Sequence, residues 1–162
     1  MDTAKFSDLD LKPEILRSIL SLGYEKMTPV QNSSLPAILS NQDVTAQAKT
    51  GSGKTVAFAC GLLEKIDVKK QAVQALVLCP TRELSQQVAD EIRKLARFIP
   101  NLKVLTLCGG TPIAPQVASL DHGAHCIVGT PGRLEDHLQR RTLNLKAVST
   151  LILDEADRML EM

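Results

Sequence analysis

Hydrophobic residues recur along the chain in two different spacings, and segments of the two kinds alternate. Apolar residues three and four apart predict amphipathic helices, which we expect at residues 11–20, 28–39, 55–66, 82–99, 113–120 and 131–140. Short, nearly continuous apolar runs predict buried strands, which we expect at residues 44–48, 75–79, 104–108, 125–128 and 150–153. This alternation predicts an α/β fold with a mainly parallel sheet covered on both faces.

Neither repeats nor a low-complexity linker interrupts the pattern, so we expect one structural domain. At 162 residues the chain can bury roughly 70% of its unfolded surface in a single core. Within that domain, residues 1–40 are expected to form N-terminal helices, and residues 41–162 the core that begins with the first strand.

The charge balance limits the partners that the chain can attract. The sequence contains nineteen Lys and Arg residues and eighteen Asp and Glu residues. Because the charges nearly cancel, a nucleic acid would have to bind at local sites and not through an overall positive charge. The 2% aromatic content argues against a stacking platform for bases. No apolar run approaches the ~20 residues of a membrane span, and the N-terminus is polar. We therefore expect a cytoplasmic protein without a membrane partner.

The cysteines do not form a framework. Cys60, Cys79, Cys108 and Cys126 are scattered through apolar runs, which predicts buried, reduced thiols. The stretch DHGAHC at residues 121–126 contains metal-ligand side chains, but no second ligand pair at zinc-like spacing accompanies it. We interpret it as a polar turn that leads into a strand.

A phosphate-binding loop is predicted where the first strand ends. The sequence AKTGSGKT begins at Ala48 and fits G-x-x-x-x-G-K-[ST], with alanine where glycine is usual. Gly51 and Gly53 allow a tight turn whose N–H groups point inward. Lys54 supplies a charge for the β- and γ-phosphates, and the Thr55 hydroxyl can bind Mg²⁺. The alternative is a Gly-Ser surface loop with a stray lysine.

Two carboxylates follow the last apolar strand. Asp154 stands at the carboxyl end of the run LIL, the sheet edge where ligands bind in open α/β folds. A carboxylate there can hold Mg²⁺, and Glu155 is placed to orient or deprotonate an attacking water. The alternative is an acidic helix N-terminus, where carboxylates are favourable in any protein.

Three further strand-to-helix junctions carry similar chemistry: PTREL after Cys79, GGTP after Cys108 and GTPGR after Val128. In a parallel sheet all of them reach one edge, where they expose free N–H groups and threonine hydroxyls. Such a row of anion sites suits a phosphodiester backbone. The candidate residues are Thr81, Arg82, Gly110, Thr130 and Arg133. Ordinary helix capping, for which Thr130 before a proline is well suited, is the alternative.

Taken together, these motifs resemble a known family. AQAKTGSGKT, PTRELSQQ, GG, TPGR and DEAD, in this order, are similar to the N-terminal RecA-like domain of DEAD-box ATP-dependent RNA helicases. Gly23-Tyr24 followed by Thr28-Pro29-Val30-Gln31 resembles that family's adenine-recognising Q motif, with Phe6 at its upstream aromatic position. ALVLCPTREL and LTLCGGTP resemble the bacterial DbpA group. The resemblance covers essentially the whole chain.

The resemblance implies a three-layer RecA-like P-loop NTPase fold that uses ATP and Mg²⁺. Gln31 would read the adenine edge and Phe6 would stack near the base. The implied nucleotide-binding residues are Phe6, Tyr24, Thr28, Gln31, Thr50, Gly51, Ser52, Gly53, Lys54 and Thr55. Lys54, Asp154 and Glu155 would be catalytic, and Thr55 and Asp154 would hold Mg²⁺, partly through water. Thr81, Arg82, Gly110, Thr130 and Arg133 would contact RNA phosphates and sugars largely without regard to sequence.

Gln31 has a second explanation. Thr28-x-x-Gln31 is a capping box, in which the glutamine side chain bonds to the N–H at its own helix N-cap. Spacing alone favours the cap, whereas the family resemblance favours adenine recognition. The two roles do not exclude each other.

The family's Ser-Ala-Thr segment and second RecA-like domain, with its arginine fingers, are missing from the sequence. We therefore expect a sheet that is incomplete on its C-terminal side, a marginally stable chain, and negligible hydrolysis by this chain alone. Two other functions stay open: a truncated, non-catalytic module that binds a nucleotide or a partner, and another P-loop NTPase such as a small kinase or GTPase.

Overall fold

The computed structural model describes residues 4–162, and the chain divides into two compact units. Unit 1 contains the residues up to Lys65 together with Glu91–Pro100. Unit 2 contains Ile66–Asp90 and Asn101–Met162. The single-domain organisation with segments 1–40 and 41–162 stays a prediction.

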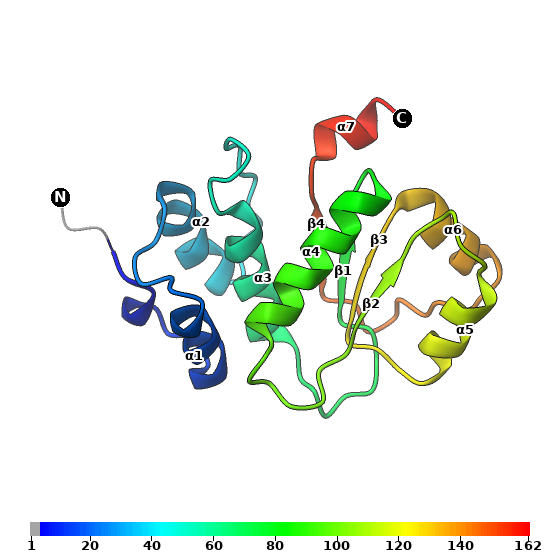
Figure 1. Cartoon of the computed structure of the whole chain (residues 1–162), viewed down its shortest axis with the longest axis horizontal. Coiled ribbons are helices and arrows are strands. Elements are labelled where there is room, and N and C mark those ends of the chain that lie inside the picture. The colour runs from blue at the N-terminus through cyan, green and yellow to red at the C-terminus, as the bar shows by residue number, and fades with distance from the viewer. Residues whose placement is uncertain (1–3) are drawn as a thin grey trace. The chain divides into compact units, whose positions relative to one another are not determined.

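Unit 1 is helical. Its elements are the 3₁₀ turn η1 (Phe6–Asp8), α1 (Pro13–Ser21), α2 (Pro29–Leu39) and α3 (Lys54–Lys65), together with the end of α4 (Arg82–Leu95) (Figure 1). α1 and α2 each begin with a proline, whose fixed φ suits the first helical position. α2 and α3 pack closely because Gly61 leaves room for the Ile38 side chain, which a Cβ would meet. The apolar faces of these helices form the core of the unit.

The strand predicted at residues 44–48 is wrong. Residues 43–49 adopt no regular structure, and Val44 is 40% exposed. The segment alternates apolar and polar residues, but no strand pairs with it among the described residues. Alternation can indicate which side of a strand is apolar, but a strand also needs a partner for its backbone groups.

Unit 2 is an α/β unit with a four-stranded parallel sheet. The strands are β1 (Ala75–Leu78), β2 (Val104–Leu107), β3 (Cys126–Gly129) and β4 (Thr150–Leu153), in the order β2-β3-β1-β4. The helices are the first part of α4, then α5 (Ala114–Asp121), α6 (Pro131–Gln139) and α7 (Ala156–Leu160). The predicted α/β fold with a parallel sheet is confirmed.

The strand register aligns the carboxyl ends of all four strands. Leu107, Gly129, Leu78 and Leu153 form one row across the sheet. Gly129 is required in this row, because a Cβ there would collide with the Leu107 carbonyl oxygen and with the Leu134 side chain. Segments that leave the strands beyond this row therefore start from a common edge.

Both faces of the sheet are buried around the two central strands. On one face, Leu76 and Ile127 pack with Leu134 of α6, and Leu120 of α5 packs against the same cluster. Figure 1 shows α5 and α6 on this side. Val77 and Val128 on the opposite face are fully buried.

β4 is an edge strand, as β2 is, and it pairs only with β1 among the described residues, but its leucines are much more exposed. Leu151 and Leu153 are 58% and 51% exposed, whereas Leu76, the register partner of Leu151, is 8% exposed. The apolar face of the sheet thus continues onto an open edge.

The helices differ from the predicted ones by a residue or two at most ends, and more notably in three respects. The helix expected at residues 82–99 ends at Leu95, because residues 96–99 form turns. α5 begins at Ala114, with Ile113 as its N-cap, so Thr111-Pro112 does not start it. α7 was not predicted from the sequence.

No helix among residues 4–162 has the length and apolar character needed to cross a membrane.

Candidate functional site

The phosphate-loop motif forms a tight turn that opens directly into α3. Gly51 and Gly53 have φ values of +80° and +91°, which side chains rarely tolerate. The Lys54 ammonium donates to the Ala48 carbonyl at 2.7 Å, across the loop. The Ser52 Oγ atom is buried without a hydrogen-bond partner in the described structure. An ammonium group and an unused hydroxyl inside a turn of backbone N–H groups suit an anion.

Gln31 connects the start of α2 to this loop. Its side-chain oxygen accepts from the Thr28 N–H at 2.9 Å, and the Gln31 N–H donates to Thr28 Oγ1 at 3.4 Å, which confirms the capping box. Its amide nitrogen donates to the Gly53 carbonyl at 3.1 Å. A Cβ at Gly53 would collide with that nitrogen. Recognition of adenine by Gln31 stays a prediction.

The other predicted nucleotide-binding residues differ in accessibility. Tyr24 is 41% exposed, and Thr50 at the loop tip is also exposed. Phe6 is only 1% exposed, because its ring fills part of the core of unit 1. A stacking partner needs an accessible ring face, so in this conformation Phe6 does not offer one.

Part of the predicted RNA-binding row comes together just beyond the carboxyl end of β1. The Thr81 hydroxyl accepts from the Leu84 N–H at 3.2 Å and caps α4. Arg82 is exposed, and its guanidinium group lies against Gly110, where a Cβ would meet it. Gly110 has a φ of +84°. The loops after β1 and β2 therefore meet here, as the common sheet edge predicts.

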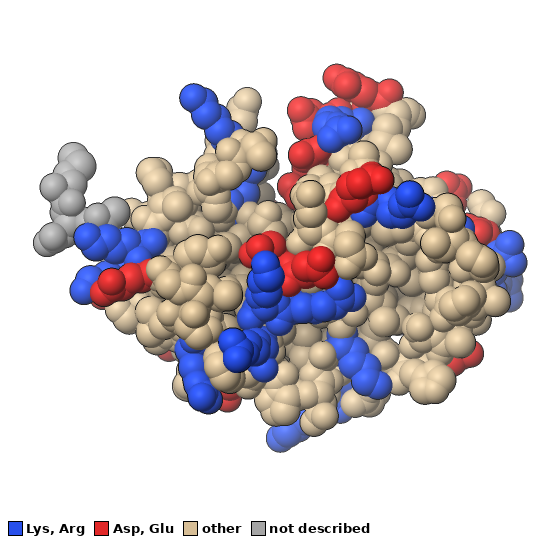
Figure 2. Space-filling model, viewed as in Figure 1, with Lys and Arg blue, Asp and Glu red and all other residues tan. Residues whose placement is uncertain are grey.

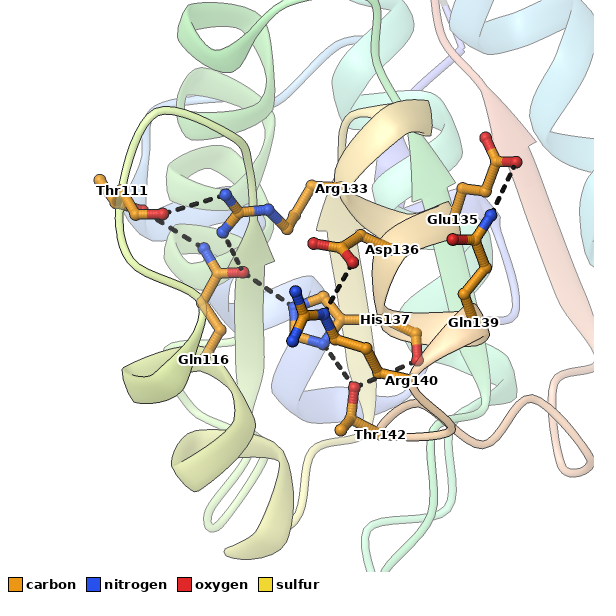
Figure 3. Close-up of polar contacts among 9 residues, drawn as sticks. All are labelled: Thr111, Gln116, Arg133, Glu135, Asp136, His137, Gln139, Arg140 and Thr142. Atoms are coloured by element: carbon orange, nitrogen blue, oxygen red, sulfur yellow. Dashed lines mark hydrogen bonds and ion pairs between the residues drawn. The ribbon is translucent and has the colours of Figure 1, made fainter.

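The junction after β3 holds the remaining two candidates. Thr130 is the N-cap of α6, but its side chain makes no capping bond. Arg133, in the first turn of α6, donates to the Thr111 carbonyl at 3.0 Å and to Gln116 Oε1 at 3.2 Å (Figure 3). The Arg133 guanidinium is thus bound to the loop after β2.

Gln116 and His137 extend this arrangement inward, and sequence reasoning missed both. Gln116 donates to the Cys108 carbonyl at 3.0 Å, and its oxygen lies 2.9 Å from His137 Nε2 (Figure 3). Burial, and secondarily the Arg133 charge, lower the pKa of His137. The only hint in the sequence is a histidine three residues after Leu134, on the buried side of α6.

Asp154 and Glu155 follow β4, as predicted. The Asp154 N–H donates to the Leu78 carbonyl at 3.0 Å, which continues the pairing of β4 with β1. Burial, and secondarily the negative charge of Asp154, raises the pKa of the nearby Cys79 thiol to about 12. Glu155 has a φ of +52°, and its carboxylate bonds Arg158 at 2.7 Å. Figure 2 shows acidic side chains gathered over α7. Arg158, three residues after Glu155, was not anticipated.

The four cysteines are buried and free, which confirms the predicted thiols. The stretch 121–126 leads from the end of α5 into β3. His125 accepts the Lys103 N–H at 3.0 Å on one ring nitrogen, and its other ring nitrogen lies 3.0 Å from the Val68 carbonyl oxygen. Both nitrogens are thereby used within the fold.

The candidate residues divide between the two units. Those for the nucleotide lie in unit 1, whereas the two carboxylates and the five RNA-binding candidates lie in unit 2. The expected magnesium ligands are a hydroxyl at Thr55 and a carboxylate at Asp154. Oxygen donors of this kind are the ones that Mg²⁺ prefers.

A family profile described as DEAD/DEAH box helicase matches residues 28–162. The chain belongs to this family. It is 61% identical over 158 residues to the ATP-dependent RNA helicase DbpA of Escherichia coli K12, an alignment that covers 97% of this chain and 35% of the relative. The ATP-dependent RNA helicase DeaD of Mycobacterium tuberculosis H37Rv is 48% identical, over 98% of this chain and 28% of that protein.

A solved helicase structure agrees with this assignment. The crystal structure of a DEAD box protein from the hyperthermophile Methanococcus jannaschii superposes with a TM-score of 0.92 at 46% identity, covering 98% of this chain and 43% of that one. The predicted DEAD-box resemblance, including its likeness to DbpA, is confirmed. The chain spans about a third of the length of the curated relatives named here.

Proposed function

We propose that this chain is the ATP-binding, RecA-like part of a cytoplasmic ATP-dependent RNA helicase. The observation that carries the proposal is the 61% identity to an ATP-dependent RNA helicase over 97% of the chain. In such a protein, ATP binding and hydrolysis drive RNA duplex unwinding or remodelling together with a second RecA-like domain. This chain alone is proposed to bind nucleotide and to hydrolyse it negligibly, since arginine fingers in P-loop enzymes contribute roughly 10³–10⁵ in rate.

The phosphate loop supports ATP as the nucleotide. Lys54 would leave the Ala48 carbonyl for the β- and γ-phosphates, and the Ser52 hydroxyl would gain the partner it lacks. Mg²⁺, held by Thr55 and Asp154 partly through water, would neutralise phosphate charge. Gln31, fixed beside Gly53, would pair bidentately with the adenine edge, its remaining amide hydrogen donated to N7 and its side-chain oxygen accepting from the N6 amino group, which guanine lacks.

Glu155 is proposed to accept the proton of the attacking water. Its carboxylate is paired with Arg158 in this structure, so it would have to exchange that partner for the water.

The edge of unit 2 supports RNA as the polymer. Thr81, Arg82, Gly110, Thr130 and Arg133 follow strands whose carboxyl ends form one row. Backbone N–H groups, hydroxyls and guanidinium groups bind phosphates and sugars, which carry no base identity. Binding is therefore proposed to be largely independent of sequence.

Calorimetry on the chain tests the nucleotide assignment. ADP should bind at least about tenfold more tightly than GDP, because a site built to pair with one base leaves polar groups unpaired with the other. Lys54→Ala should weaken ADP binding by about 10- to 100-fold, the value of a hydrogen bond to a charged group. Glu155→Gln should leave affinity unchanged, since that residue acts on water.

Lys65→Ala, an exposed lysine at the end of α3, is the control for lost charge and should bind ADP normally. Equal affinity for ADP and GDP, or undiminished binding by Lys54→Ala, would refute the assignment.

A further inference from the structure

A partly buried polar network joins α5, α6 and the loop after β2 on one side of the sheet (Figure 3). Its inner member is His137, which is fully buried and lies 2.9 Å from Gln116 Oε1 and 2.8 Å from Thr142 Oγ1. Its outer member is Arg133, which bonds the same Gln116 oxygen. Two helices are thus joined through one amide oxygen.

The hydrogen-bond directions in this network follow from chemistry. The Gln116 amide nitrogen donates to the Cys108 carbonyl, so the amide oxygen must face Arg133 and His137. An amide oxygen only accepts, and therefore His137 Nε2 carries a hydrogen. The Thr142 hydroxyl lies at the other ring nitrogen and fixes the plane of the ring. The orientation of the Gln116 amide is thereby fixed by the Cys108 carbonyl, Arg133 and His137.

Arg133 is the point where this network reaches the predicted RNA edge. One of its terminal nitrogens bonds Gln116, and the other bonds the Thr111 carbonyl in the loop that carries Gly110. Gly110 in turn lies against the Arg82 guanidinium. The contacts of His137 and Gln116 therefore extend to two arginines and to the backbone between them.

We propose that Gln116 and His137 are positioning residues for RNA binding, which hold Arg133 and the Gly109–Thr111 loop in their binding arrangement before RNA arrives. The inference rests on the proposed RNA-binding function of this edge. An arginine that is already held loses less conformational freedom when it binds phosphate. Removing the network should weaken binding although neither side chain contacts RNA.

The first experiment measures the affinity of the chain for a mixed-sequence single-stranded RNA by fluorescence anisotropy. His137→Ala and Gln116→Ala should each bind about three- to tenfold more weakly, which corresponds to ordering one long side chain. His137→Gln should recover part of the loss, because its amide can donate to Gln116. Gln139→Ala is the matched control, since Gln139 is exposed on the same helix and bonds only Glu135 in Figure 3.

A double-mutant comparison separates positioning from a purely structural role. In an Arg133→Ala background, His137→Ala should cause a smaller further loss of RNA affinity than in the wild type, because the arginine that it positions is gone. Its effect on the urea midpoint of unfolding should be the same in both backgrounds. An additive loss of affinity, or an equal loss in Gln139→Ala, would overturn the proposal.

NMR on the RNA-free chain keeps this inference separate from the proposed function. Nitrogen relaxation of the Arg133 side chain should show an ordered Nε–H group that becomes mobile in His137→Ala but not in Gln139→Ala. A wild-type chain that binds no RNA would refute the proposed function. An Arg133 side chain that is equally mobile in all three proteins would refute the positioning.

Discussion

Gln31 shows how one side chain can satisfy two structural demands at a candidate site. Its oxygen and backbone N–H complete the cap of α2, while its amide nitrogen bonds the phosphate loop at Gly53. Spacing predicted the first contact, because both partners lie within one helical turn. The second contact joins residues 22 positions apart, and only the packing of α2 on α3 brings them together.

His137 gives a prediction at this scale. Its pKa in the folded chain is below the ordinary value of 6.5, so the fold favours the neutral ring. Its neighbours on α5 and on the loop after α6, Gln116 and Thr142, are uncharged, while Arg133, Asp136 and Arg140 on its own helix carry charge. As pH falls below about 6.5 the unfolded chain takes up the proton first, and the free energy of unfolding must fall.

Urea unfolding between pH 5 and pH 8 measures this effect. The wild type should lose stability on acidification faster than His137→Gln, by at most about 1.4 kcal/mol per pH unit for one proton. Gln139→Ala is the control, because Gln139 is exposed at the end of α6 and has no titratable side chain, so the wild-type slope should be unchanged. Identical slopes for the wild type and His137→Gln would contradict the prediction.

Sequence analysis could identify those candidate residues that belong to a short motif. Lys54 and Glu155 were found because the chemistry of each depends on its immediate neighbours along the chain. Gln116 and His137 lie 21 positions apart, and neither stands in a motif. Their partnership depends on how α5 and α6 pack on the sheet, which no local spacing encodes.

Elements were predictable where an apolar face met a partner. Periodicity located α1 to α6 and β1 to β4 because each helix carries an apolar stripe and each strand an apolar run in the sequence. It failed at residues 43–49, where alternation without a neighbouring strand leaves irregular backbone. It also extended α4 beyond Leu95, since apolar residues continue the stripe through turns that are not helical.

Helix capping provides a prediction at the element scale. α2 and α6 both begin with a threonine at the N-cap followed by proline, but only Thr28 makes a side-chain capping bond. Thr28→Ala should lower the free energy of unfolding by about 0.5–2 kcal/mol. Thr130→Ala should change it by less than about 0.5 kcal/mol, as ordinary partly exposed positions do.

Chemical denaturation of the two variants beside the wild type measures both changes, with equal m-values as the check that the unfolded states are comparable. A loss at Thr130 as large as that at Thr28 would show that its hydroxyl caps α6 in solution. That result would also weaken the proposal that the Thr130 hydroxyl is available to RNA.

At the scale of the whole molecule, one sheet edge organises unit 2. Parallel strands in a common register bring the loops after β1, β2 and β3 and the acidic segment after β4 to one row of strand ends. The chain has a formal net charge of only +1, and Figure 2 shows both signs of charge interspersed on the face drawn. An anionic polymer must therefore be bound by local contacts, and the aligned carboxyl ends of the strands bring the groups for such contacts together.

The same sheet has an exposed side edge, which gives the last prediction. β4 pairs on one side only among the described residues, and Leu151 and Leu153 are more than half exposed. An unpaired apolar edge is a template for another strand, so we expect two copies of the chain to associate through β4 at high concentration. Leu151→Lys should prevent association, because a charge on an edge strand opposes pairing.

Leu138→Lys, at a 43% exposed leucine on α6, is the matched control and should still associate. Sedimentation velocity over a range of concentrations measures the difference. If the wild-type chain stays monomeric at every concentration and melts cooperatively above about 60 °C, the unpaired edge neither drives association nor lowers the stability of the chain appreciably.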